Sequence, residues 1–163
     1  MNKVALLIGG NQGNRRKLIE QATELIRERI GSVVALSAIY ETEPWGEFEV
    51  ESGKGRVESF LNRALLVETS MSPHEVLHEA LAIEAVLGRR RAAGERHLYH
   101  SRPMDIDIIF YNDAVVDTPD LTIPHPRAHL RRFVLEPLAE LIPDYRHPVF
   151  GKTVAELLGG LRV

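Results

Sequence analysis

The chain has 163 residues, of which 44% are hydrophobic, so it is long enough for one domain with a full core, and we expect a single domain over residues 1–163. It has no cysteine, which excludes disulfides, thiolate zinc sites and a cysteine nucleophile. The formal net charge of −3 gives no overall attraction to nucleic acid or to an anionic membrane. Residues 1–3 lead directly into an apolar run instead of a signal peptide, which favours a cytoplasmic location.

The first half of the chain predicts three strands and a helix. Residues 4–8 form an apolar run bounded by Gly9 and Gly10, which is typical of a central strand buried on both faces. Asn14 can cap the helix that follows, Gly31 would end it in a left-handed conformation, and apolar residues recur at helical spacing at Leu18, Ile19, Ala22, Leu25, Ile26 and Ile30. Residues 33–40 and 57–68 are predicted strands, and segment 46–56 between them is a predicted mobile loop.

The second half begins with a predicted helix over residues 73–87. Ser72 and Glu75 form a capping box around Pro73, and Gly88 ends the helix. A strand from Asp105 follows, and the later features are a turn at residues 112–113, an apolar pair at 115–116, a loop at 124–126, and a short final helix capped by Thr153 and Glu156. The order βαββαβ predicts an α+β, ferredoxin-like core, with two helices against one face of an antiparallel sheet and C-terminal additions available for the other face.

Asp105 and Asp107 are the most informative residues of the chain. Because side chains alternate along a strand, both carboxylates are predicted on one face, with Ile106 and Ile108 on the other. Such a pair is unfavourable unless a cation lies between the two charges, and carboxylate oxygens suit Mg²⁺, which takes its remaining ligands from water and from nucleotide phosphates. For a bare Asp-x-Asp motif, a solvated edge strand is the more common explanation.

A cluster of arginines precedes the aspartates. It consists of Arg89, Arg90, Arg91, Arg96 and Arg102. Guanidinium groups make planar, bidentate contacts with phosphate oxygens, so carboxylates for a metal and arginines for phosphate together predict a triphosphate site. The simpler interpretation is a basic surface loop that contacts nucleic acid.

Two polar residues interrupt apolar patterns. Glu84 shares a predicted helical stripe with Leu77 and Leu81, so its carboxylate either belongs to a site or reaches water at the edge of the stripe. Asn62 lies inside a predicted strand, where an amide either contacts a ligand or makes a local hydrogen bond.

Several short segments occur in a characteristic order: Gly9-Gly10-Asn11, Tyr40-Glu41-Thr42-Glu43-Pro44-Trp45-Gly46, Phe60-Leu61-Asn62, Ile83-Glu84, Gly88-Arg89-Arg90-Arg91, Arg102-Pro103-Met104-Asp105-Ile106-Asp107-Ile108, Pro124-His125-Pro126-Arg127 and Arg131-Arg132-Phe133-Val134-Leu135-Glu136-Pro137-Leu138. Together they resemble the hydroxymethyldihydropterin pyrophosphokinases of folate biosynthesis. The resemblance implies a three-layer α/β/α sandwich and transfer of the pyrophosphoryl group of ATP to the hydroxymethyl oxygen of a reduced pterin, with release of AMP. It also implies two Mg²⁺ ions and ATP as co-substrate. We further expect a monomer, and the net charge of −3 favours neither nucleic acid nor membrane as a partner.

The resemblance also implies a role for each matching residue. Asp105 and Asp107 would bind the metal ions, and the catalytic set would add Arg89 and Arg102. The nucleotide would contact Glu84, Arg89, Arg91, Arg102, Ile108, His125 and Arg131. The pterin would contact Thr42, Glu43, Trp45, Phe60, Asn62 and Phe133. From the residues alone, His125 could be a satisfied loop histidine and Trp45 a surface aromatic.

The chain departs from the family pattern before the aspartate motif. Many members have Trp-Gly-Pro-Arg there, whereas residues 94–102 here are a longer segment without tryptophan, in which Tyr99 or His97 would take over the stacking. Pro126 stands where an aromatic usually follows the active-site histidine. Two alternatives remain: a non-catalytic nucleotide-binding protein, and a ferredoxin-like RNA-binding module, which would need surface aromatics beside basic residues that the predicted strands do not offer.

Overall fold

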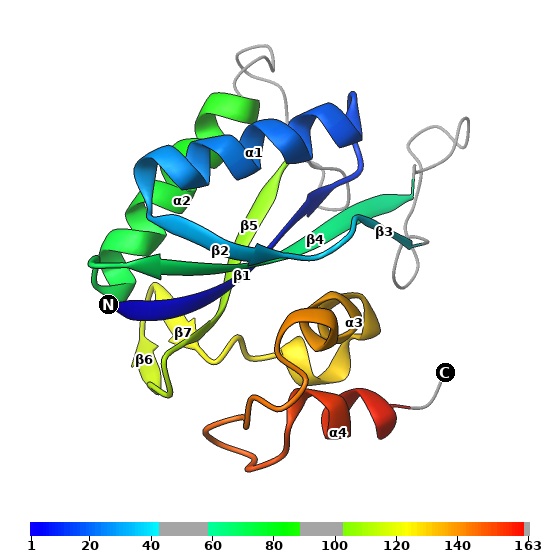
Figure 1. Ribbon diagram of the computed structural model, residues 1–163. Helices are drawn as coiled ribbons and strands as arrows, with labels where there is room; N and C mark the ends of the chain where they lie inside the picture. The colour runs from blue at the N-terminus through cyan, green and yellow to red at the C-terminus, as the bar shows by residue number, and fades with distance from the viewer. Residues whose placement is uncertain (43–58, 89–102, 162–163) are drawn as a thin grey trace.

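A computed structural model describes residues 1–42, 59–88 and 103–161 of the chain, and Figure 1 shows its arrangement. Its elements in chain order are β1 (Asn2–Gly10), α1 (Arg15–Arg29), β2 (Ser32–Leu36), β3 (Tyr40–Thr42), β4 (Phe60–Thr69), α2 (Pro73–Gly88), β5 (Asp105–Tyr111), β6 (Val116–Thr118), β7 (Leu121–Ile123), the 3-10 helix η2 (Ala128–Leu130), α3 (Arg132–Leu141) and α4 (Val154–Gly159).

The predicted ferredoxin-like core is confirmed. The main sheet is antiparallel, its strands lie in the order β2-β4-β1-β5, and β3 extends it by pairing with β4 beyond β2. Helices α1 and α2 lie side by side across one face, and α3 and α4 lie across the other (Figure 1). The C-terminal additions therefore complete the three-layer sandwich.

Two apolar cores separate the layers, and the alternation along β1 divides its side chains between them. Val4, Leu6 and Ile8 pack under α1 and α2, whereas Ala5 and Leu7 face α3 and α4. The residues of both sets are almost completely buried, which explains the continuous apolar run that predicted a central strand.

The predicted helix caps are confirmed. Asn14 Oδ1 accepts a hydrogen bond from the backbone N–H of Lys17 at 3.2 Å. Ser72 and Glu75 make both bonds of a capping box, at 2.8 and 3.2 Å, and Thr153 and Glu156 make the equivalent pair before α4. Caps are local interactions, so the sequence spacing alone is sufficient to predict them.

Three local predictions are wrong. Gly31 does not adopt a positive φ; a Cβ at this position would lie 2.1 Å from the carbonyl oxygen of Glu68, so glycine is required by the close approach to β4. The predicted strand 33–40 is split into β2 and β3 at Ser37, whose hydroxyl accepts the backbone N–H of Ala64 at 2.9 Å. The stripe through Leu81 does not face the core, because this side chain is 54% exposed.

Helix α3 was not predicted. Its interior contains Pro137, a residue that removes a backbone donor and usually ends a helix. Val134, Leu135 and Leu138 are nevertheless buried against the sheet, so tertiary packing stabilises a helix that local propensity disfavours.

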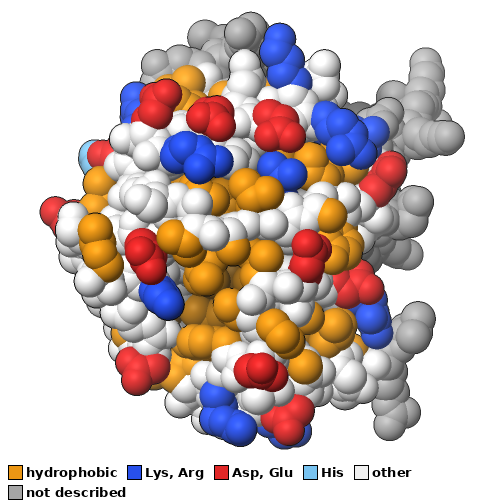
Figure 2. All heavy atoms as spheres, viewed as in Figure 1, with side chains coloured by type: hydrophobic (Ala, Val, Ile, Leu, Met, Phe, Trp, Pro, Cys, Tyr) orange, Lys and Arg blue, Asp and Glu red, His pale blue; other side chains and the backbone are white. Residues whose placement is uncertain are grey.

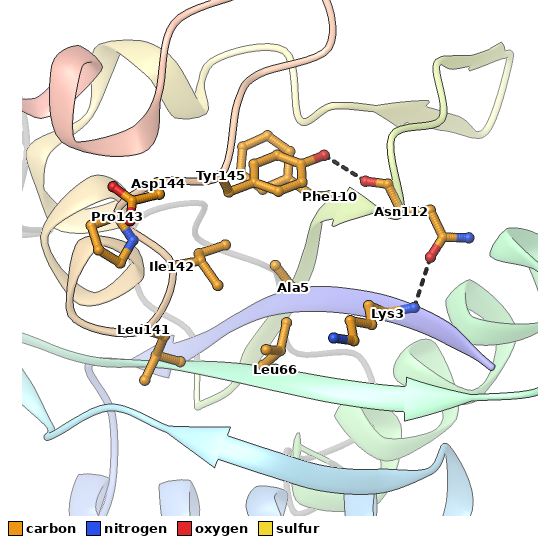
Figure 3. Close-up of a pocket in the computed structure, with 10 residues that line it drawn as sticks. All are labelled: Lys3, Ala5, Leu66, Phe110, Asn112, Leu141, Ile142, Pro143, Asp144 and Tyr145. Carbon is orange, nitrogen blue, oxygen red and sulfur yellow. Dashed lines mark hydrogen bonds between the residues drawn. The ribbon is translucent and has the colours of Figure 1, made fainter.

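The C-terminal layer is joined to the sheet through Tyr145. Its hydroxyl donates to the carbonyl oxygen of Asn112 at 2.5 Å, and its ring lies 4.4 Å from that of Phe110, centroid to centroid. The Asn112 side chain in turn accepts the backbone N–H of Lys3 at 2.8 Å. These residues line a cavity of about 450 Å³ between β1, β4 and the end of α3 (Figure 3). Figure 2 shows hydrophobic side chains gathered around a hollow on this side of the molecule.

Replacing Tyr145 with Phe is expected to destabilise the protein at neutral pH and much less at high pH. Burial, with a smaller contribution from Asp113, raises the pKa of Tyr145 to about 12. A raised native pKa gives stability that is complete below pH 10 and is lost as the pH rises toward 12, amounting to about 1 kcal/mol after allowance for solvent screening. Denaturant unfolding of wild type and Tyr145→Phe at pH 8 and pH 11.5 measures the difference in unfolding free energy between the two proteins at each pH. An equal difference at both pH values would contradict the burial of this hydroxyl.

Candidate active site

Asp105 and Asp107 lie at the start of β5 on the face covered by α3. Ile106 and Ile108 are both 5% exposed and belong to the core under α1 and α2, whereas the two aspartates are half-buried on the opposite side. Asp107 pairs in the ladder with Leu7, whose side chain faces α3. Paired residues share a face, so the structure confirms that both carboxylates point the same way.

Gly9 lies between Asp105 and Asn62 in a row across three strands. It pairs with Asn62 of β4 on one side and with Asp105 of β5 on the other. A Cβ at Gly9 would lie 2.3 Å from Asn62 Oδ1 and 2.4 Å from the carbonyl oxygen of Leu61, so no larger residue fits. Two strand spacings, about 10 Å, separate the backbones of Asn62 and Asp105. The Asn62 amide lies over Gly9, because its Oδ1 occupies the place that a Cβ would take.

Asn62 and Thr42 come together near the start of β4. The Asn62 side chain is buried, and its Nδ2 lies 3.5 Å from Thr42 Oγ1, at the limit of a hydrogen bond. Phe60 pairs with Thr42 in the ladder between β3 and β4. The local hydrogen bond is therefore present but long, and a primary amide has further donor and acceptor capacity for a ligand.

The segment before α3 adds basic groups on the same face. Arg131 immediately precedes α3, and its guanidinium carbon lies 5.6 Å from the ring centroid of Phe133. His125 follows β7, and its backbone N–H donates to the carbonyl oxygen of Ile109 in β5 at 3.0 Å. The backbone N–H of Arg127 donates to His125 Nδ1 at 3.3 Å. His125 and Arg131 are thus held beside the strand that contains the aspartates.

The pKa values of His125 and Arg131 are shifted partly by charges on neighbouring side chains, so these groups lie within electrostatic range of one another. The pKa of His125 is lowered by burial and then by the positive charges of Arg131 and Arg127. Burial and the charge of Arg127 also lower the pKa of Arg131, and the carboxylate of Asp107 opposes this shift. Repulsion between positive charges contributes to both shifts, so the site combines a carboxylate pair with basic groups whose mutual repulsion a bound anion would relieve.

Glu84 contacts β5 from the opposite layer. The buried positions of α2 are Val76, Ala80 and Ile83, and the Glu84 carboxylate accepts the backbone N–H of Ile106 at 2.7 Å. The sequence allowed two interpretations of Glu84, a site residue or a carboxylate that reaches water, and neither includes this hydrogen bond to the backbone. Ile108 is buried in the core, so a contact between this residue and a nucleotide would use its backbone.

Several predicted site residues fall outside the described part of the chain. These are Glu43, Trp45, Arg89, Arg91 and Arg102, together with the stacking candidates His97 and Tyr99 and the loop 46–56. Within residues 1–42, 59–88 and 103–161, no group of three or more His, Asp or Glu side chains could hold a metal ion. Two carboxylates nevertheless fit Mg²⁺, because this ion commonly completes its coordination with water and substrate phosphates.

Two contributors were missed from the sequence. Gly9 was assigned to the end of a strand and quoted in the motif Gly9-Gly10-Asn11 without a role, although its pairing places it between Asn62 and Asp105. Arg127 was quoted in a motif without a role, and only the packing of the chain after β7 brings it close to His125.

No helix in the described ranges is long and apolar enough to cross a membrane.

Similarity to known proteins covers most of the chain. The family model for 7,8-dihydro-6-hydroxymethylpterin-pyrophosphokinase (HPPK) matches residues 5–143. The 2-amino-4-hydroxy-6-hydroxymethyldihydropteridine pyrophosphokinase of Porphyromonas gingivalis is 38% identical over 146 residues, covering 89% of this chain and 93% of the relative. That of Methylorubrum extorquens is also 38% identical, over 99% of this chain and 94% of its own.

The fold is similar to that of solved HPPK-DHPS structures. The wild-type Plasmodium falciparum HPPK-DHPS with SDX-DHP aligns with a TM-score of 0.73 at 19% identity. The alignment covers 98% of this chain and 43% of that chain, so this protein spans less than half of the longer one. At this identity the similarity shows the fold alone.

Proposed function

The chain belongs to the 7,8-dihydro-6-hydroxymethylpterin-pyrophosphokinase family, and we propose that the residues gathered on the α3 face of β1, β4 and β5 form its active site. The enzyme transfers pyrophosphate from ATP to 6-hydroxymethyl-7,8-dihydropterin, giving the pterin diphosphate and AMP, in folate biosynthesis. In this reaction the pterin hydroxyl releases its proton to solvent and its oxygen bonds to the β-phosphorus, while the bond from that phosphorus to the oxygen bridging to the α-phosphorus breaks, so that AMP leaves with the bridging oxygen.

Asp105 and Asp107 are proposed to hold two Mg²⁺ ions. Their carboxylates lie on one face at the start of β5. The backbones of both residues pair with β1, which fixes where the two side chains begin. Bound Mg²⁺ would supply charge neutralisation and a template for the triphosphate. The aspartates themselves would orient the ions and take no part as nucleophiles.

The basic residues are proposed to bind the triphosphate. Arg131 lies within electrostatic range of Asp107, and burial followed by neighbouring positive charge lowers the pKa values of both His125 and Arg131. Arg89, Arg91 and Arg102 would complete the set from outside the described residues. Fixed positive groups that face developing phosphate charge stabilise the transition state because they need no reorganisation.

The pterin is proposed to lie at the Asn62 end of the row. A flat, polar ring needs donors and acceptors at its edge and apolar contacts on its faces. Asn62 and Thr42 would supply the edge contacts, while Phe60 and Phe133 would supply the apolar ones, with Glu43 and Trp45 as further contacts. The Asn62 amide, which lies over Gly9, would hold the ring with its hydroxymethyl group directed toward the metal end.

One observation supports this assignment above the others: a carboxylate pair, a basic cluster and a buried amide share one sheet face, although they come from distant parts of the chain. Incubation with Mg²⁺, ATP and the reduced pterin alcohol tests it, with AMP and the pterin diphosphate as products. ATP binding without AMP would favour a nucleotide-binding protein without catalysis. Binding of single-stranded RNA in place of the pterin would favour an RNA-binding module.

We further propose that the enzyme is a single-domain, cytoplasmic monomer without nucleic-acid or membrane partners. The slightly acidic net charge of −3 supports the part of this proposal that concerns nucleic acid and anionic membranes. Light scattering at micromolar concentration measures the oligomeric state.

Binding of an ATP analogue is expected to raise the pKa of His125. In the free protein, burial and the nearby arginines lower this pKa, so the associated stability is present above pH 6.5 and is lost as the pH falls. Phosphate charge would offset Arg131 and Arg127 and so favour the imidazolium form. NMR titration of the His125 ring with and without the analogue and Mg²⁺ measures the change, and a lower or unchanged pKa would place the triphosphate elsewhere.

A further inference from the structure

We propose that Glu84 is a positioning residue for the metal-binding aspartates, and that it acts through the backbone amide of Ile106. The proposal rests on the proposed function, because it gives Asp105 and Asp107 the role of metal ligands. Glu84 Oε2 lies 2.7 Å from the nitrogen of Ile106, the residue between the two aspartates. A single carboxylate of α2 therefore contacts the middle of the Asp-x-Asp segment.

The hydrogen bond supports the side of β5 that the sheet leaves open. Among the described residues, β5 pairs with β1 alone and is the last strand of the sheet. Successive N–H groups of a strand point alternately toward its two edges, and that of Ile106 points to α2 and away from β1. Residues 105–107 are thus held by β1 on one edge and by Glu84 on the other.

The position of the bond makes it important for the aspartates. Asp105 is the first residue of β5, and strand ends are where pairing opens most easily. A carboxylate that accepts from a backbone N–H forms a charge-assisted bond, which is stronger than a neutral one. Because Asp105 and Asp107 are neighbours of the bonded amide on either side, a shift of this amide would change the spacing of both carboxylates.

Helix α2 provides a rigid support for Glu84. The preceding residue, Ile83, is completely buried, as is Val76 two turns earlier, and Ala80 between them is 1% exposed. This packing fixes the helix against the sheet and leaves the Glu84 side chain directed at the edge of β5. The acidic residue in an otherwise apolar region of the helix is thereby explained without a direct contact to substrate.

Amide exchange in the metal-free protein tests the proposal with Glu84→Ala, Glu84→Gln and the control Glu79→Ala. Glu79 lies on the same helix but pairs with Arg29 of α1 at 3.8 Å. In Glu84→Ala the Ile106 amide is expected to exchange about tenfold faster or more, because its acceptor is lost. In Glu84→Gln the side-chain oxygen can still accept, so most of the protection should return, and Glu79→Ala should match wild type at Ile106.

A metal titration provides the second readout. The Mg²⁺ concentration that half-saturates binding of an ATP analogue should rise several-fold in Glu84→Ala and be largely restored in Glu84→Gln. Wild-type exchange at Ile106 in Glu84→Ala would overturn the proposal. So would equal loss of nucleotide affinity in both variants with Ile106 still protected, since that result marks a direct nucleotide contact. Failure of the wild type to form AMP would refute the enzymatic function without altering the exchange result, so the two failures are distinguishable.

Discussion

Asp105→Ala and Asp107→Ala are expected to abolish AMP formation while the metal-free protein stays folded. Each change removes a metal ligand, and the electrostatic stabilisation that a bound cation supplies to phosphoryl transfer amounts to several kcal/mol. Without metal the two carboxylates repel each other, so Asp105→Ala should leave the melting temperature unchanged or slightly higher. Asp107 also attracts Arg131, so the melting temperature of Asp107→Ala should rise less than that of Asp105→Ala. Product formation and thermal unfolding in EDTA measure the two effects.

Asp120→Ala is the matched control, because the Asp120 carboxylate pairs with His74 in the first turn of α2, whereas the aspartate segment of β5 contacts Glu84 near the other end of this helix. Its activity should equal that of wild type. A clear fall in melting temperature for both active-site variants in metal-free buffer would show that Asp105 and Asp107 have a structural role.

Arg102→Ala and Arg89→Ala are expected to slow the chemical step by roughly 10²-fold or more, with little change in pterin affinity. The reason is that a guanidinium group facing the transferred pyrophosphoryl group acts mainly in the transition state. Lysine should rescue poorly at either position, because it cannot make the planar, bidentate contact. Single-turnover rates and pterin binding, measured separately, distinguish the two effects.

Arg132→Ala is a suitable control for charge removal near the site. Arg132 follows Arg131 in the chain but forms a surface ion pair with Glu136 at 3.6 Å. Its loss should change the rate little. An unchanged single-turnover rate in Arg102→Ala or Arg89→Ala would place that arginine outside the site.

Local features of this protein could be predicted from its sequence, and long-range ones could not. The caps at Asn14 and Ser72 and the alternation of Asp105 with Ile106 depend on residues a few positions apart, and all are confirmed. The role of Gly31 depends on β4, which lies far along the chain, and the sequence offered only the commoner left-handed explanation. Helix α3 was missed because its stability comes from burial against the sheet.

The same limit applies to the site. Strand periodicity places Asp105 and Asp107 on one face, but the row of Asn62, Gly9 and Asp105 depends on the registers of two strand pairs. Registers are set by the packing of whole strands, and no short motif specifies them. Glu84 stood out as an exception to a pattern, yet its partner is a backbone amide, which has no signature in the sequence.

The proposed substrate site on the row across β4, β1 and β5 cannot form before the protein folds. Its residues come from positions 9, 62 and 105, so the pocket exists only after both long-range pairings have formed. Contacts of such large sequence separation form slowly, and a partly folded chain has no surface to offer a nucleotide. A ligand at 100 times its dissociation constant would therefore add about 2.7 kcal/mol to the native state alone. In the cell, the supply of substrates would then influence how long each molecule of this enzyme survives proteolysis.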